Sequence, residues 1–456
     1  MAALAGLGML FVANAPAAGD QTAPVTSSAN TTQTYPLSAT SAAAECDAST
    51  IQRSTMDDVA SATKVKTRLG YRLMPGRYQG LCLTLVGHDA SGQSLVALDN
   101  GHFFGPNYGD DQGILWLIPG LIRAFHLTLD EGIDFFFGAA LACSLFLGLL
   151  GFFLLLRETI SRAIAVAGLG ALFVGTWMVG DVYVFYVVPA VAVVPLFLWF
   201  IRTAIPSPGF AVFLFVSGVV IGISEIVRSQ SGTATLIFLV FVLLAARQLV
   251  GKWRLILCAV LLVGMTVPYL AYEHAVIQRS EFLAPREPKA LTQKGHVLWH
   301  SVYIGLGFLQ NSYVPAYLDE VGYAEVHSID PSVYPFSPEY ERILRREVFR
   351  LARAHPDFLL TTMAAKAGVV LAYLLICANI GLLAAFFYPK GWVVETAFWL
   401  AMGFDSLFGL LIVPKPTYLL GLIAFAVMYG ILSIGHAIEE GTPPAAGRRG
   451  WRFVQR

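Results

Sequence analysis

The chain has 456 residues, of which 56% are hydrophobic and only 13% are charged, and its mean hydropathy is +0.65. Soluble domains carry about 25% charged residues, so this composition excludes an ordinary soluble protein and indicates a chain that sits largely in lipid. The 30 basic and 30 acidic residues balance and form no long basic tract, which excludes a nucleic-acid-binding protein.

The chain begins with a short apolar run, residues 1–15, followed by a polar region at 16–131. No Lys or Arg precedes the run, as a signal peptide would require, yet it ends in small residues that resemble a cleavage site. We interpret it as a first span, with a signal-like segment or a truncated start as the alternatives. Residues 17–50, rich in Ala, Ser and Thr, predict a flexible segment, and residues 80–86 predict a small β patch.

Residues 109–126 have an acidic start and then an apolar stretch that is too short to cross a bilayer. They predict an interfacial or re-entrant helix that leads to the next span. The adjacent carboxylates of Asp110 and Asp111 repel each other, which tends to raise the pKa of one of them. Either residue could act as a general base or hold a divalent cation, and no other cofactor is indicated. The alternative is a solvated turn that caps the helix.

Long apolar runs, each close to the roughly 20 residues that cross a bilayer, fill residues 132–274 and 363–438. They predict a six-helix membrane block and a three-helix membrane block, so with residues 1–15 the fold class is an all-α polytopic membrane protein of about ten helices. The predicted spans are about 133–156, 161–179, 182–201, 209–227, 233–250, 254–273, 363–388, 392–413 and 417–437.

Basic residues fall on one side of the bilayer when these spans alternate, and the positive-inside rule makes that side the cytoplasm. The short loops on the other side hold Asp181, Glu225, Arg228 and Lys415. Both large polar regions, 16–131 and 275–362, are therefore expected to be extracytoplasmic, and 439–456 forms a basic cytoplasmic tail. The basic residues in question are Arg157, Arg162, Arg202, Arg247, Lys252, Arg254, Lys390, Arg448, Arg449, Arg452 and Arg456.

The second large loop contains two groups of residues that could bind a ligand. His296 and His300 are four residues apart and would share a helix face, a spacing that can bind zinc, but no third ligand is evident. Packing with the neighbouring Trp299 at the interface, or stacking of a sugar ring, are the other interpretations. Residues 338–359 predict an amphipathic helix whose arginines could meet anionic lipid or pyrophosphate, or could form a solvated face: Arg342, Arg345, Arg346, Arg350 and Arg353.

Charged residues near the predicted outer ends of spans are the remaining candidates, because a charge in the membrane is costly and usually paired or functional. Glu225 and Arg228 could form an ion pair within one helix, or Arg228 could hold a lipid phosphate. Lys366 could supply a second phosphate contact or extend its side chain to the interface. Asp405 could pair with a cation or act as a polar residue near a helix end.

The five cysteines fall into two groups. Cys143, Cys258 and Cys377 lie in apolar runs and are interpreted as small core residues. Cys46 and Cys82 lie in the first polar region, where they could pair if that region faces an oxidising compartment.

An acidic pair in the first outer loop, an interfacial helix, many spans and a second large outer loop resemble the GT-C class of integral-membrane glycosyltransferases. The resemblance covers about residues 100–437, and its motif support is Asp110 and Asp111. It implies a bacterial inner-membrane enzyme with a polyprenyl-phosphate sugar donor, an acidic base in the first outer loop, and a glycan, lipid or protein acceptor. Glu225, Arg228 and Lys366, with His296, Trp299 and His300, would then contact substrate or phosphate.

Two other functions compete with this interpretation. An O-antigen-type polymerase or ligase also uses large outer loops with arginines, which fits the second loop but not the acidic pair. A transporter is the alternative outside enzymes, although the sequence shows neither an inverted repeat nor an obvious pair of broken helices.

Overall fold

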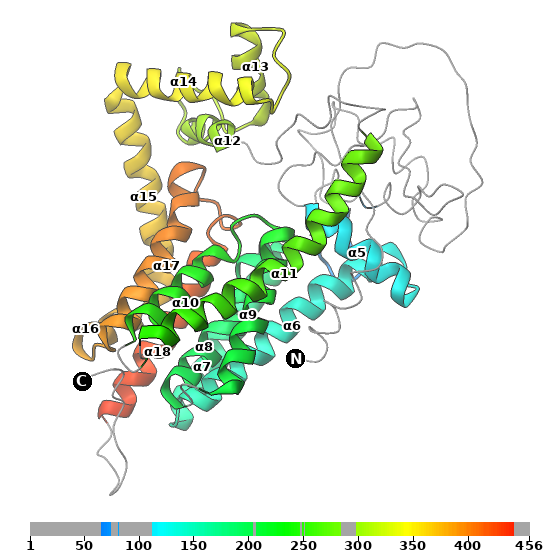
Figure 1. Cartoon of the computed structure of the whole chain (residues 1–456). Helices are drawn as coiled ribbons and strands as arrows, with labels where there is room; N and C mark the ends of the chain where they lie inside the picture. The colour runs from blue at the N-terminus through cyan, green and yellow to red at the C-terminus, as the bar shows by residue number, and fades with distance from the viewer. Residues whose placement is uncertain are drawn as a thin grey trace, which may run out of the picture.

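Figure 1 shows the protein as a computed structural model, which describes residues 65–73, 81, 112–203, 207–246, 249, 251–283 and 298–441. Several sequence predictions fall outside these residues. They are the run at 1–15, the flexible segment at 17–50, the pair Asp110 and Asp111, Cys46, Cys82, His296 and the tail from 442 onward.

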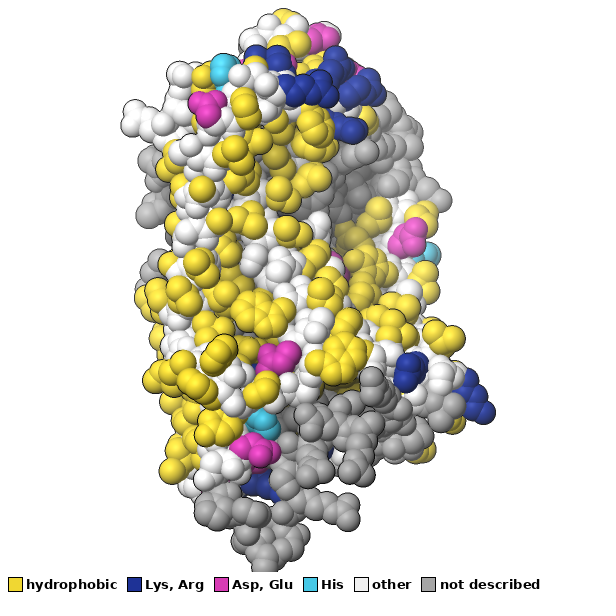
Figure 2. Space-filling model, turned by 90° about the vertical axis from the view of Figure 1, so that its left-hand side faces the viewer, with side chains coloured by type: hydrophobic (Ala, Val, Ile, Leu, Met, Phe, Trp, Pro, Cys, Tyr) yellow, Lys and Arg dark blue, Asp and Glu magenta, His cyan; other side chains and the backbone are white. Residues whose placement is uncertain are grey.

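Helices that are long and apolar enough to cross a membrane number eight among the described residues, which confirms the polytopic all-α fold class. They pack side by side as a bundle (Figure 1). Exposed apolar side chains cover the visible face of this bundle (Figure 2), as a lipid-facing surface requires. The spans are α6 (Leu129–Leu155), α7 (Thr159–Val179), η2 (Val182–Tyr186) continued by α8 (Val188–Thr203), α9 (Pro208–Val227), α11 (Gly251–Leu283), α15 (Pro356–Ala378), α17 (Trp392–Leu411) and α18 (Leu420–Gly441).

One detail of the sequence prediction needs correction, and two others fall wholly or largely outside the described residues. The span expected at 233–250 is α10 (Thr233–Ala245), which has only 13 residues because Ala246 already adopts extended backbone angles. The tenth expected span lies outside the described residues. A two-stranded antiparallel ladder joins β1 (Val65–Lys66) to β2 (Arg72–Leu73), earlier than the β patch expected at 80–86, of which only Leu81 is described.

Local sequence signals fix the starts of several helices. The Thr128 side chain accepts a hydrogen bond from the backbone N–H of Glu131 while the Glu131 side chain accepts one from the Thr128 N–H, a capping box that begins α6. The Ser207 side chain accepts a hydrogen bond from the Phe210 N–H and so caps α9, with Pro208 in its first turn. Ser337 and Pro338 start α14 (Pro338–Ala354), which ends five residues before the end of the amphipathic helix predicted at 338–359.

Glycines allow α9 and α11 to cross at close range. A Cβ atom on Gly218 would lie 2.1 Å from the Leu261 carbonyl oxygen, and one on Gly264 would lie 2.1 Å from the Phe215 carbonyl oxygen. Because lipid supplies no hydrophobic drive between helices, close backbone packing of this kind is what holds a membrane bundle together.

Gly218→Ala should therefore lower the free energy of unfolding by about 1–3 kcal/mol through overpacking. Gly170 in α7 is the matched control, since a Cβ there would meet nothing within 4 Å. Gly170→Ala should leave stability unchanged or raise it by up to about 1 kcal/mol through helix propensity. Thermal unfolding in detergent, followed by circular dichroism, measures both variants, and equal midpoints would contradict the close crossing.

A small helical unit, here called the head, stands at one end of the bundle. It consists of α12 (Leu298–Gly305), η4 (Leu306–Phe308), α13 (Asp319–Ile329) and α14, around its own apolar core. Helix α14 runs almost at right angles to α15, which begins at Pro356 and carries the chain into the bundle (Figure 1). We call this end of the bundle the head side and the opposite end the tail side.

Helix α15 and the short α16 (Ile380–Phe387) together correspond to the span expected at 363–388. Asn379 separates them with a φ of 35°, and its side chain caps α16. Because α15 begins at Pro356, its first two turns rise beyond the predicted span, and Phe358 and Leu359 of these turns pack against the core of the head.

Helix α5 (Gln112–Phe125) is the interfacial helix predicted at 109–126, and it begins at the head side. Its apolar residues from Ile114 to Ile122 are buried, Ile114 and Ile118 completely. A Cβ on Gly113 would lie 2.5 Å from the carbonyl oxygen of Ile226, so the first turn of α5 rests directly on the last turn of α9.

On the tail side, the residues assigned to the cytoplasm lie close together. The Arg157 backbone N–H donates to a carboxylate oxygen of Glu439 at 2.7 Å, and the Arg202 guanidinium donates to the Leu155 carbonyl at 3.3 Å. The ends of α6, α8 and α18 therefore meet, as the alternation of spans requires.

Candidate functional site

Arg228 lies at the head-side end of α9, where its backbone leaves the helix with φ −144° and ψ 116°. The residue is only 5% exposed. Its guanidinium carbon stands 4.7 Å from the centroid of the Tyr183 ring, a cation–π contact. The residue singled out from the sequence is thus a buried cation at the head-side end of the bundle.

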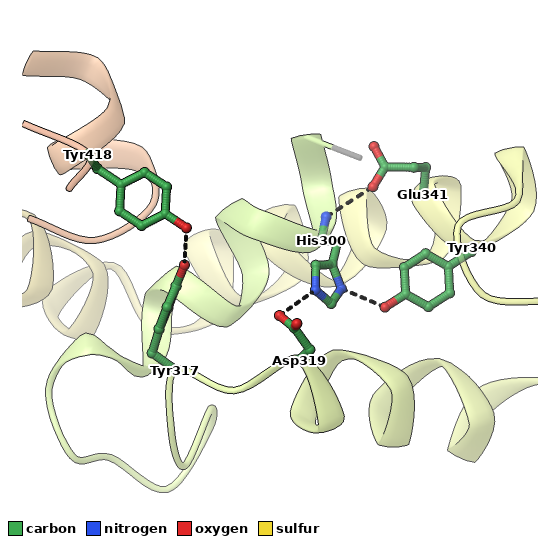
Figure 3. A network of polar contacts seen from close by, with 6 residues as sticks. All are labelled: His300, Tyr317, Asp319, Tyr340, Glu341 and Tyr418. Atoms are coloured by element: carbon green, nitrogen blue, oxygen red, sulfur yellow. Dashed lines mark hydrogen bonds and ion pairs between the residues drawn. The ribbon is translucent and has the colours of Figure 1, made fainter. Parts of the chain in front are cut away.

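Aromatic residues from three separate segments surround Arg228. Tyr183 and Tyr186 come from η2 and stack at 6.4 Å, and the Tyr183 ring meets Tyr418 edge-on at 5.3 Å. The hydroxyls of Tyr418 and Tyr317 are 3.1 Å apart (Figure 3), and the exposed Lys415 places its ammonium 4.5 Å from the Tyr317 ring centroid. We call this set the Arg228 cluster: Tyr183, Tyr186, Arg228, Tyr317, Lys415 and Tyr418.

The phenols outside the spans stay protonated at neutral pH. Burial raises the pKa of Tyr317 to about 12, the negative charge of Asp319 contributes to the rise, and Arg228 opposes it. Burial also raises the pKa of Tyr418. The cluster therefore offers hydroxyl donors beside two cations, Arg228 and Lys415, a combination suited to an anionic ligand with polar groups.

Glu225 stabilises the turn that follows Arg228. Its carboxylate accepts hydrogen bonds from the backbone N–H groups of Gln230 at 2.6 Å and Gly232 at 2.9 Å, and from the Thr233 hydroxyl at 2.7 Å. These contacts fix the turn that follows Arg228 and begin α10.

Lys366 lies in α15 and is completely buried. Its ammonium donates to the Ile412 carbonyl oxygen at 2.8 Å. Ile412 starts the connection from α17 to α18, which also carries Lys415 and Tyr418, so Lys366 supports a segment of the Arg228 cluster. The structure describes no direct contact between Lys366 and Arg228.

Asp405 lies in α17, one turn before Phe408, whose ring packs against Tyr186 at 5.8 Å. It is 2% exposed, and among the described residues neither of its carboxylate oxygens has a hydrogen-bond partner. A Cβ on Gly421 would lie 2.3 Å from one of these oxygens, so α18 closes tightly over the carboxyl group. A buried acid without partners is costly, and it lies just beneath the Arg228 cluster.

Asp405→Val should therefore stabilise the protein by about 1–3 kcal/mol, because it removes an unsatisfied buried polar group in favour of an apolar one that is no larger. Thermal unfolding midpoints of Asp405→Val and Asp405→Asn in detergent measure this effect. A lower midpoint for both variants would show that the carboxyl group makes a stabilising contact.

His300 and Trp299 lie in α12 of the head, and His296 falls outside the described residues. The buried His300 ring places Nδ1 2.6 Å from the Tyr340 hydroxyl and Nε2 3.2 Å from a carboxylate oxygen of Asp319 (Figure 3). Within the described ranges no group of three potential metal ligands exists. The ring of Trp299 is covered by the Arg345 guanidinium at 5.6 Å.

Sequence reasoning missed the four tyrosines, Asp319 and the role of Lys415. A signal existed for part of the set, since Tyr183 and Tyr186 stand at the start of a span, where aromatic residues collect at membrane interfaces. Tyr317, Asp319 and Tyr418 carried no such signal, because only the fold brings their segments together.

Comparisons with known proteins add little to this geometry. No protein-family model matches the chain, and no curated protein matches it. A crystal structure of ArnT from Cupriavidus metallidurans in the apo state is similar over 72% of this chain and 66% of that chain, with 14% identity and a TM-score of 0.28. The chain thus spans about two thirds of the length of ArnT. The described residues themselves establish a multi-pass, helical membrane protein.

Proposed function

We propose that this chain is a membrane glycosyltransferase that transfers a sugar from a polyprenyl-phosphate donor to a glycan, lipid or protein acceptor. The enzyme works on the head side, which is extracytoplasmic in a bacterial inner membrane. The observation that carries the proposal is Arg228, a guanidinium with 5% exposure at the end of a span, enclosed by tyrosines.

A lipid phosphate is a suitable ligand for Arg228. Arg228 lies at the end of a span, at the depth of a lipid headgroup, and a guanidinium binds phosphate with two parallel hydrogen bonds. A polyprenyl phosphate delivers its charge at this depth while its chain stays in lipid. When the bond from sugar to phosphate breaks, Arg228 and Lys415 stabilise the negative charge that develops on the leaving group.

The position of Asp110 and Asp111 in the sequence, just before α5, supports a role for them as the base. Gly113 packs on the Ile226 carbonyl, two residues before Arg228. Asp110 and Asp111 directly precede α5 in the sequence. One of the two carboxylates removes the proton from the acceptor hydroxyl as the donor bond breaks.

The base assignment predicts that Asp110→Asn combined with Asp111→Asn reduces sugar transfer by about 10²–10⁴-fold, because the amide cannot take up the proton. Full-length protein in lipid nanodiscs is given polyprenyl-phosphate-linked hexoses with a radiolabelled sugar, and release or transfer of label is counted. Asp357→Asn, at an exposed position of α15, is the matched control and should keep full activity. Full activity of the double variant would remove Asp110 and Asp111 from the mechanism.

An O-antigen-type ligase or polymerase is the second candidate, favoured by the exposed arginines at the end of the molecule where α14 lies (Figure 2). Most of them are engaged within α14, since Arg342 and Arg346 pair with Glu339 and Arg350 pairs with Glu347. Use of a polyprenyl-pyrophosphate glycan instead of a polyprenyl-phosphate sugar in the same assay would favour this candidate, and uptake of a solute without any transfer would favour a transporter.

A further inference from the structure

We propose that Asp319, aimed by the buried His300, binds hydroxyl groups of the acceptor, so that the acceptor is a polyhydroxyl compound, a sugar or a sugar-bearing lipid, at the head-side rim of the Arg228 cluster. This inference rests on the proposed function and adds to it a second carboxylate that no sequence signal indicated.

Asp319 is accessible and only partly engaged. It is the first residue of α13, and its side chain is 65% exposed. One carboxylate oxygen lies 3.2 Å from His300 Nε2, and no further contact of the carboxylate occurs among the described residues. A carboxylate held on one side and open on the other can accept hydrogen bonds from a ligand without rearrangement.

His300 is fixed by contacts on several sides. It is 4% exposed, and its ring stacks on Tyr323 at 5.5 Å and meets Phe336 edge-on at 5.5 Å. The Glu341 carboxylate accepts hydrogen bonds from the backbone N–H groups of Trp299 and His300, which ties the start of α12 to α14. The imidazole therefore holds one orientation, and so does the carboxylate that it contacts.

The hydrogen bonds also define the proton positions. Burial raises the pKa of Tyr340, so its hydroxyl keeps its proton. The Asp319 carboxylate can accept a hydrogen bond from an imidazole N–H at Nε2, 3.2 Å away. With that proton on Nε2, Nδ1 accepts a hydrogen bond from the Tyr340 hydroxyl at 2.6 Å. The chain from Tyr340 through His300 to Asp319 is thus fully used, and the free face of Asp319 is left for a ligand.

Asp319 is close along the chain to a member of the Arg228 cluster. Only Leu318 separates it from Tyr317, whose hydroxyl meets that of Tyr418 (Figure 3). The charges of Asp319 and Arg228 both act on the Tyr317 phenol, with opposite sign. A hydroxyl compound held at Asp319 would therefore stand beside a phosphate held at Arg228, the proximity that a transfer reaction needs.

A metal ion is a poorer occupant for Asp319 than a hydroxyl compound. Within the described ranges no group of three potential metal ligands occurs, and Lys415 places a positive charge against Tyr317 on the same rim. Adjacent hydroxyls of a sugar match a carboxylate well, because each donates one hydrogen bond and adds no charge.

The test uses full-length protein in nanodiscs, with a polyprenyl-phosphate-linked hexose as donor and octyl β-glucoside as a surrogate acceptor. Asp319→Asn and Asp319→Ala should raise KM for octyl glucoside about tenfold or more, the effect of losing a charged hydrogen bond. Hydrolysis of the donor by water and binding of sugar-free polyprenyl phosphate should stay within about twofold of wild type.

Companion variants separate positioning from a general loss of structure. His300→Gln and Tyr340→Phe should raise the same KM by smaller factors, because Asp319 keeps its charge but loses its fixed orientation. Glu320→Gln, an exposed acidic neighbour in the first turn of α13, is the matched control and should leave KM unchanged.

Three other outcomes would each overturn a different part of the proposal. An unchanged KM for octyl glucoside in Asp319→Asn would overturn the assignment of Asp319 while leaving the proposed function intact. A wild-type protein that hydrolyses the donor but transfers to no glycoside would overturn the polyhydroxyl acceptor and leave donor use standing. A wild-type protein that binds neither polyprenyl phosphate nor the donor would overturn the proposed function, and this inference with it.

Discussion

Replacing Arg228 by Gln is expected to weaken the binding of polyprenyl phosphate by about 100-fold, because removal of one partner from a desolvated charge pair costs several kcal/mol. Arg228 is 5% exposed, so solvent screens it weakly and its charge acts at nearly full strength on a bound phosphate. Arg228→Lys keeps the charge but loses the planar fork, and should weaken binding by about tenfold. Titration of full-length protein in nanodiscs with radiolabelled polyprenyl phosphate measures all three affinities.

The control for this experiment is Lys252→Gln, which removes an exposed positive charge at the start of α11 on the tail side. If binding depended only on net charge, this variant would lose as much affinity as Arg228→Gln. Equal affinity of Arg228→Gln and the wild type would instead show that the Arg228 cluster does not hold the lipid phosphate, and the proposed function would lose its main support.

Apolar length was sufficient to predict most of the membrane fold. Spans of about 20 apolar residues can be recognised without knowledge of their neighbours, since lipid imposes the same requirement on each one. The prediction failed at α10, because the span expected at 233–250 ran through the polar residues Arg247 and Gln248, whereas the helix ends at Ala245. An apolar run gives the residues available to a helix, but local backbone geometry decides where the helix stops.

The candidate site was predictable only in part. Arg228 and Lys366 were found because a charge near the end of an apolar run is rare and needs a reason. Tyr183, Tyr317 and Tyr418 are far apart in the sequence, and their contacts arise only when η2, the head and the α17–α18 connection meet. No local sequence pattern predicts these contacts between distant segments. The assignments of Asp110, Asp111 and His296 remain predictions, because these residues lie outside the described ranges.

Lys390 stabilises the junction of two helices and also marks one side of the membrane. From the sequence alone, it is only one of the basic residues predicted on the cytoplasmic side. In the structure its ammonium is buried, 2.9 Å from a Glu395 carboxylate oxygen, 2.5 Å from the Ser433 hydroxyl and 4.0 Å from the Tyr429 ring centroid. The Tyr429 hydroxyl donates to the other Glu395 oxygen at 2.8 Å. This network joins the start of α17 to α18.

Lys390→Met is therefore expected to lower the free energy of unfolding by about 3–5 kcal/mol, because Glu395 is left in a largely buried position without its cation. Lys252→Met, which removes an exposed lysine, should change it by less than about 0.5 kcal/mol. The double variant Lys390→Met with Glu395→Gln removes both charges and should recover a large part of the loss, since a neutral amide still accepts from Tyr429. Unfolding in detergent, followed by circular dichroism, measures the complete cycle with Glu395→Gln alone. If the losses of the two single variants simply add in the double variant, Lys390 and Glu395 are not coupled, and the junction of α17 and α18 is held by its apolar contacts instead.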